Sequence, residues 1–135
     1  MMYYRNTKRE IICLDDIKEL VDSFYSKVRE DEVLSHIFND RIQNRWPEHL
    51  EKMYLFWQTV LLEEHTYLGS PFLPHAQLPV GIEHFNRWME LFNKTVDERF
   101  AGITATKAKW QAERMAEMFH SKIEFYKNHH LKPLK

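Results

Sequence analysis

The sequence has few of the residues that turn or cross-link a chain. Of its 135 residues, three are glycine, five are proline and one is cysteine. Tight hairpins depend on glycine-containing turns, so the shortage of glycine argues against a β-rich fold. The single Cys13 has no second cysteine with which to form an internal disulfide or a zinc site. These absences favour a helical protein without covalent cross-links.

Long apolar runs and an excess of one charge are also missing. The longest uninterrupted apolar run, residues 53–57, is far shorter than the roughly 20 residues that span a bilayer. The first ten residues contain no apolar stretch of signal-peptide length. Lysine and arginine total 19 against 20 acidic residues, which gives a net charge of -1. We therefore expect a cytoplasmic protein that has neither a nucleic acid nor a membrane as partner.

Aromatic residues and helical periodicity are abundant. The chain contains 4 Trp, 6 Tyr and 9 Phe. Apolar residues recur at helical spacing in a first stretch that starts at Asp15 or Asp16, and again over 47–62, 82–100 and about 104–126. A short helical piece precedes an expected loop at 39–46, and residues 66–81 hold three of the five prolines and two of the three glycines. The pattern predicts an all-α protein with one long irregular segment.

Eight histidines raise the question of a metal or a cofactor. There is no HExxH motif, and Glu117 with His120 is a single Glu-x-x-His pair, whereas a di-iron bundle needs two such helices. His75 lies between prolines that restrict the backbone, and His49 lies at the edge of an apolar helical face beside Met53. Either histidine alone also fits a structural role. Together they suit a flat apolar macrocycle with one axial ligand.

Two further side chains combine an apolar body with a hydrogen-bond donor. Tyr25 ends the apolar face of the first helix, and Trp88 lies on the apolar face of the helix over 82–100. A buried phenol or indole needs a hydrogen-bond partner. Each residue is therefore a candidate for a ligand pocket, and each is equally explained as a core residue bonded to the backbone.

Six short motifs occur in a specific order. They are FYSKVR at 24–29, IFN at 37–39, WPEH at 46–49, FW at 56–57, PHAQLP at 74–79 and HFNRWMELF at 84–92. In this order and spacing the chain resembles the bacterial truncated haemoglobins of group III over about residues 12–125. The resemblance implies an all-α, truncated globin-like two-over-two helical sandwich around haem. Residues 1–135 would form a single globin-like haem-binding domain, with an N-terminal extension at 1–12 and a flexible tail at 129–135.

The resemblance also implies which residues hold the cofactor, haem (iron protoporphyrin IX). His75 matches the proximal ligand of the iron, and Phe38 matches the phenylalanine that packs on the porphyrin face. Met53 falls where an apolar residue covers the iron, and Lys52 falls where a cation can reach a haem propionate. Trp57, in the FW motif, belongs to the same expected set of cofactor-binding residues.

The remaining implied residues surround the gas ligand. Tyr25, His49 and Trp88 match distal positions of the family. The resemblance thus implies a protein that binds O₂, NO or CO at iron held by His75, in O₂ and NO handling. Two alternatives stay open. One is a haem enzyme, NO dioxygenase-like or peroxidase-like, served by an unknown reductase. The other is a cofactor-free helical interaction module whose aromatic residues are only core.

Overall fold

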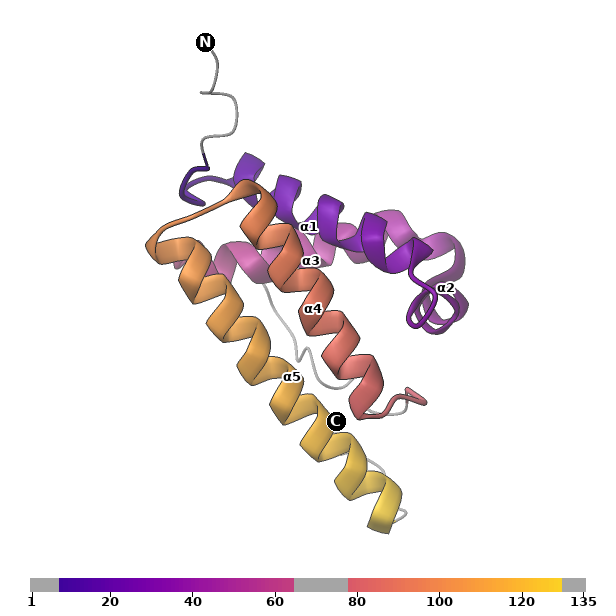
Figure 1. Ribbon diagram of the computed structural model, residues 1–135. Coiled ribbons are helices and arrows are strands. Elements are labelled where there is room, and N and C mark those ends of the chain that lie inside the picture. Colours follow the sequence, from indigo (N-terminus) through magenta and orange to yellow (C-terminus); the bar gives the residue numbers. More distant parts are fainter. Residues whose placement is uncertain (1–7, 65–77, 130–135) are drawn as a thin grey trace.

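The computed structural model describes residues 8–64 and 78–129, and all the regular elements in these two ranges are helices. The prediction of an all-α fold is therefore confirmed. Neither range contains a helix that is both long and apolar enough to cross a membrane. In chain order the elements are α1 (Leu14–Glu30), α2 (Ser35–Ile42), the short 3-10 helix η2 (Gln43–Arg45), α3 (Trp46–Leu62), α4 (Ile82–Arg99) and α5 (Ile103–His129) (Figure 1).

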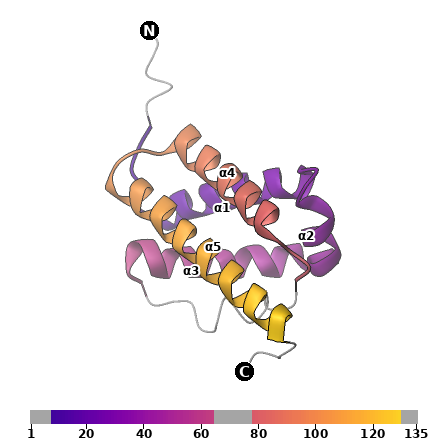
Figure 2. The same cartoon turned by 60° about the horizontal axis from the view of Figure 1, so that its bottom comes forward.

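The four long helices form two antiparallel pairs. Helix α3 runs back along α1, and α5 runs back along α4, so that α4 and α5 lie in front of the first pair in Figure 1. Figure 2 shows α4 beside α1 and α5 crossing over α3. This is the predicted two-over-two sandwich. It arises because each helix carries an apolar stripe that must be covered, as α1 does with Ile17, Leu20, Val21, Phe24 and Val28.

Aromatic rings fill the space between the two pairs. Phe92 of α4 lies at the centre, with the Trp57 ring stacked on it at 5.2 Å between centroids and the Trp88 ring at 5.5 Å. Phe24 of α1 meets both Phe92 and Trp88 edge-on, at 5.2 and 5.1 Å. Rings in such offset and edge-to-face arrangements hold one another in place more firmly than burial alone does.

The segment expected to be a loop at 39–46 is largely helical. Helix α2 continues to Ile42, η2 follows it, and α3 begins at Trp46. Ile42 and Trp46 are both buried, and the Trp46 indole N–H donates to Oδ1 of Asn39 at 3.2 Å. The buried side chains of Ile42 and Trp46, four residues apart, hold this short stretch in a helical conformation, although its polar sequence has no helical pattern. Pro47 occupies the first turn of α3, where its missing N–H costs nothing.

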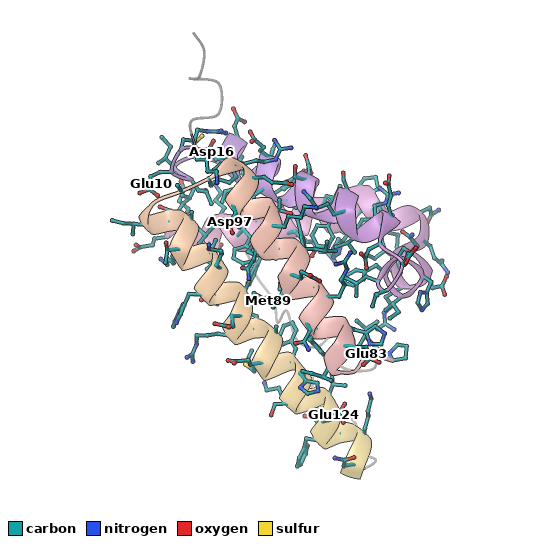
Figure 3. All side chains as sticks on the ribbon, in the orientation of Figure 1. Glu10, Asp16, Glu83, Met89, Asp97 and Glu124 are labelled. Carbon is teal, nitrogen blue, oxygen red and sulfur yellow. The ribbon has the colours of Figure 1, made fainter. Side chains whose placement is uncertain are left out.

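Residues 8–12 pack against the fold. Ile11 is buried, and the Asp16 carboxylate of α1 accepts hydrogen bonds from the Arg9 side chain at 2.7 Å and from the Ile12 N–H at 3.0 Å. The Glu10 carboxylate accepts from the first two N–H groups of α5, those of Ile103 and Thr104, at 2.9 Å each. Figure 3 shows Glu10 and Asp16 together at the end of the molecule where α4 passes into α5. Glu10 therefore caps a helix that begins 93 residues later in the chain.

Asp31 joins the turn after α1 to α4. Its buried carboxylate accepts from the Arg87 guanidinium at 2.7 and 2.6 Å, and from the N–H groups of Val33 and Leu34 at 3.0 and 3.2 Å. Burial by itself would raise the pKa of Asp31. The hydrogen bonds from Arg87 and from the backbone outweigh burial and hold the pKa below its usual range.

We expect Asp31→Asn to lower the free energy of unfolding by about 2 kcal/mol at neutral pH, since it removes a charged acceptor from a buried network. A carboxyl whose folded pKa is depressed contributes stability above the unfolded pKa of about 3.9 and loses it as the pH falls through the folded value. Urea unfolding of both proteins from pH 7 to pH 4 and below should show the difference narrowing at the acid end. The exposed Asp40→Asn serves as control. An equal deficit at every pH would contradict a role for the charge.

Candidate functional site

A pocket opens between α1, the α1–α2 turn, α2, α4 and α5. Its walls are mostly apolar and aromatic, and the side chains of Tyr25, His84 and Trp88 bring the polar groups. Sites for small molecules and cofactors have this composition, with apolar walls and a few polar groups that orient the ligand. The lining residues are Tyr25, Leu34, Phe38, Leu78, Val80, His84, Phe85, Trp88, Met115, Ala116, Phe119 and Ile123.

Tyr25 brings a protonated hydroxyl to this pocket. The side chain is buried, with its ring edge-on to Phe24 at 4.9 Å. Burial raises the pKa of the Tyr25 phenol well above its usual value, so the hydroxyl keeps its proton across the physiological range. Within residues 8–64 and 78–129 the hydroxyl has no hydrogen-bond partner. Tyr25 is therefore a donor without an acceptor in the described part of the chain.

Trp88 of α4 brings a second donor to the pocket. Its ring is stacked parallel to Phe92, with an interplanar angle of 9°, and Phe24 packs against it at 85°. These two contacts fix the plane of the indole, whose N–H can only donate. No residue that the structure describes accepts a hydrogen bond from it. A rigid donor in an apolar wall is suited to a small acceptor that enters the pocket.

His49 lies next to Tyr25 rather than in the described lining. Its ring packs edge-to-face against Tyr25 at 5.0 Å and against Trp46 at 5.4 Å. Trp46 is held in turn by the Arg29 guanidinium, 4.5 Å from the ring centroid, and by its hydrogen bond to Asn39. The half-buried imidazole is thus between two aromatic rings at the start of α3.

The other predicted site residues occupy different surroundings. Phe38 lines the pocket, 6.3 Å from Tyr25 between ring centroids. Met53 is half-buried against the main hydrophobic core, Trp57 is buried within it, and Lys52 is exposed on α3. His75 lies outside the described residues. The roles of these five residues toward a cofactor stay predictions.

Sequence reasoning did not place α5 or His84 at the site. Met115 and Phe119 belong to an apolar helical face that was visible in the sequence, but nothing in that face indicates what it covers. The sequence does contain a signal for His84. It follows Gly81 at the three-residue spacing of a helix-capping pair. Its Nδ1 accepts the Gly81 N–H at 2.9 Å, which makes Nε2 the donor of the neutral ring.

Residues 8–64 and 78–129 contain no group of three or more His, Cys, Asp or Glu side chains arranged to hold a metal ion.

Three comparisons with known proteins agree with this geometry. The family model described as bacterial-like globin matches residues 10–124. A group 3 truncated hemoglobin, ctb, of Campylobacter jejuni is 32% identical over 126 residues, which cover 90% of this chain and 99% of that protein. The crystal structure of the group III truncated hemoglobin from Campylobacter jejuni superposes with a TM-score of 0.78 at 32% identity, covering 87% of this chain and 95% of that one. The chain therefore belongs to the bacterial-like globin family and has the two-over-two fold of a group III truncated haemoglobin.

Proposed function

We propose that this protein is a cytoplasmic haem protein that binds O₂ and other diatomic gases in the pocket between α1, α4 and α5. Membership of the globin family implies a haem cofactor. The observation that carries the proposal is the presence of two donors, the Tyr25 hydroxyl and the Trp88 indole, in an apolar pocket where the described chain offers them no acceptor. When bound, haem supplies an iron atom that takes O₂, NO or CO as a ligand.

The residues of the pocket fit such a group. Phe38, Phe85 and Phe119 supply aromatic and apolar surface for a flat macrocycle and exclude water from it. We place His75 as the protein ligand of the iron, Tyr25 and Trp88 as donors to the gas, and His49 as a side chain that controls entry to the site. Burial raises the pKa of Tyr25, which keeps its proton available for donation across the physiological pH range.

Titration of the haem-free protein with haem, followed by visible absorption, tests this proposal. We expect one haem per chain and a spectrum distinct from free haem. Met115→Trp should weaken binding at least tenfold, because Met115 lines the pocket and a larger ring fills it. Met118→Trp is the matched control, since Met118 is exposed on the same helix. Circular dichroism confirms that both variants fold. A folded chain that leaves the haem spectrum unchanged would be a cofactor-free helical module.

A further inference from the structure

Three aromatic rings meet where α1 packs against the first turn of α3. The Trp46 ring lies 5.8 Å from the Tyr25 ring and 5.4 Å from the His49 ring, between centroids. The imidazole is edge-to-face with both Trp46 and Tyr25, at 87° in each case. Rings arranged in this way attract one another beyond what their burial contributes. Trp46 therefore contacts both a proposed donor to the gas and the proposed entry residue.

Two neighbouring elements hold Trp46 in place. The guanidinium of Arg29, in the last turn of α1, lies over the indole, 4.5 Å from the ring centroid. The Asn39 side chain of α2 accepts the indole N–H at 3.2 Å, and its Nδ2 donates to the Arg29 carbonyl oxygen at 3.3 Å. These contacts form a closed set between α1, α2 and α3. We call Arg29, Asn39 and Trp46 together the Trp46 anchor.

The first turn of α3 depends on this anchor because it has no local cap. Arg45, the residue before the helix, makes no side-chain cap hydrogen bond within the part of the chain that the structure describes. Helix ends fray when their terminal N–H groups lack such partners. Trp46 is the first residue of α3 and is only 5% exposed, so its burial holds the turn instead. His49 lies in the same turn, and the position of its imidazole follows that of Trp46.

We propose that Trp46 is a positioning residue, which Arg29 and Asn39 hold in place and which keeps His49 beside Tyr25, so that it sets how fast a gas ligand enters the pocket. This inference rests on the proposed function, in which His49 controls entry. Neither Trp46 nor Arg29 lines the pocket that the structure describes, so their substitution acts through His49 and not on the bound gas. A looser anchor lets the imidazole leave the Tyr25 ring, which should speed association and leave dissociation nearly unchanged.

Stopped-flow mixing of the ferrous holoprotein with CO tests the proposal. Trp46→Phe keeps a ring but loses the hydrogen bond to Asn39, so the association rate should rise by about two to ten times, the change that one hydrogen bond produces. Arg29→Gln changes an exposed side chain and should act in the same direction. Trp110→Phe and Arg114→Gln are matched controls, because Arg114 lies over the exposed Trp110 ring of α5 at 4.9 Å. Both controls should leave the rate unchanged.

A double-mutant cycle with His49→Ala separates positioning from a general loss of structure. If Trp46 acts through His49, Trp46→Phe should change CO association by less than about 1.5-fold in the His49→Ala background, since the residue that it positions is gone. Equal acceleration in the two backgrounds, or no acceleration in the wild-type background, would overturn the proposal.

A second readout does not require haem. In the NMR spectrum of the haem-free chain, the ring resonance of His49 is identified by its loss in His49→Ala. Arg29→Gln should shift this resonance by moving the indole, whereas Arg114→Gln should not. A chain that binds no haem and still shows the shift would contradict the proposed function and support the positioning role. A His49 resonance that stays unchanged in both Arg29→Gln and Trp46→Phe would exclude that role, whether or not the chain binds haem.

Discussion

His75→Gly should abolish haem retention, and added imidazole should restore it. A neutral imidazole is the protein donor that most globins place on iron. In a glycine variant the space left by the side chain admits a free imidazole, which replaces the lost ligand without the covalent link. We expect the purified variant to lose haem to an acceptor protein at least 100 times faster than the wild type. With imidazole present, the ferrous spectrum of the wild type should return.

His84→Gln is the control for this experiment, since His84 is the histidine that the described residues place in the pocket wall. The Nδ1 of His84 already accepts a hydrogen bond from the Gly81 N–H, so we expect the His84→Gln variant to retain haem normally. Haem retention by the His75 variant together with haem loss by the His84 variant would show that His84, and not His75, is the iron ligand. Normal haem retention by both would remove the proximal role from the two residues.

Tyr25→Phe and Trp88→Phe should each speed O₂ release by about 10 to 150 times. Haem, when bound, would give an O₂ ligand partial negative charge, which Tyr25 and Trp88 would stabilise as preorganised donors in a pocket with little water. A hydrogen bond to a charged acceptor contributes about 1.5–3 kcal/mol, and 1.4 kcal/mol corresponds to a factor of ten. The phenol keeps its proton because burial raises its pKa, and the indole is held by Phe24 and Phe92. Stopped-flow dissociation measures the effect directly.

Carbon monoxide separates hydrogen bonding from pocket shape. CO carries far less charge, so its release should change little in either variant. In our proposal the two donors share one acceptor, so the double variant should lose less than the sum of the single losses. His49→Ala provides a comparison, because an entry residue should alter association more than dissociation. Equal acceleration of O₂ and CO release would show that Tyr25 and Trp88 act by filling space, and no acceleration would place them outside the ligand site.

The sequence predicted the elements of this fold better than their limits and contacts. Helices α1 and α4 follow from periodic apolar positions, but α2 extends to Ile42 because Ile42 and Trp46 are buried, which no local pattern indicates. The spacing of Asp16 and Glu19 is that of an acidic helix cap and a residue that can cap back, and it predicts a cap at Asp16. In the structure Cys13 stands at that cap, and the Asp16 carboxylate binds Arg9 and the Ile12 N–H instead. A side chain that could cap a helix locally can instead form hydrogen bonds with another partner that the tertiary structure brings close, as Asp16 does with Arg9.

The same limit applies to the pocket. Tyr25 and Trp88 are pocket candidates from their own chemistry and Phe38 from the family resemblance, and the structure places all three in one lining. Met115 and Phe119 could not be assigned to the pocket in this way. The apolar face of α5 indicates that this side of the helix is covered, but it does not indicate what covers it. His75 lies outside the described residues, so its role is still inferred from the motif around it.

The cap that Glu10 makes on α5 joins residues that are far apart in the sequence and are therefore synthesised at different times. The carboxylate of Glu10 accepts hydrogen bonds from the N–H groups of Ile103 and Thr104, which are synthesised 93 and 94 residues after it. Closing so long a loop costs entropy that must be spent before the contact can form, and contacts of this separation slow folding. During synthesis α1 and α3 can pair before α5 is made, whereas the carboxylate of Glu10 stays solvated until α5 emerges. A chain interrupted before α5 therefore lacks the partners of the Glu10 carboxylate and keeps the contacts of Arg9 and Ile12 with Asp16 of α1.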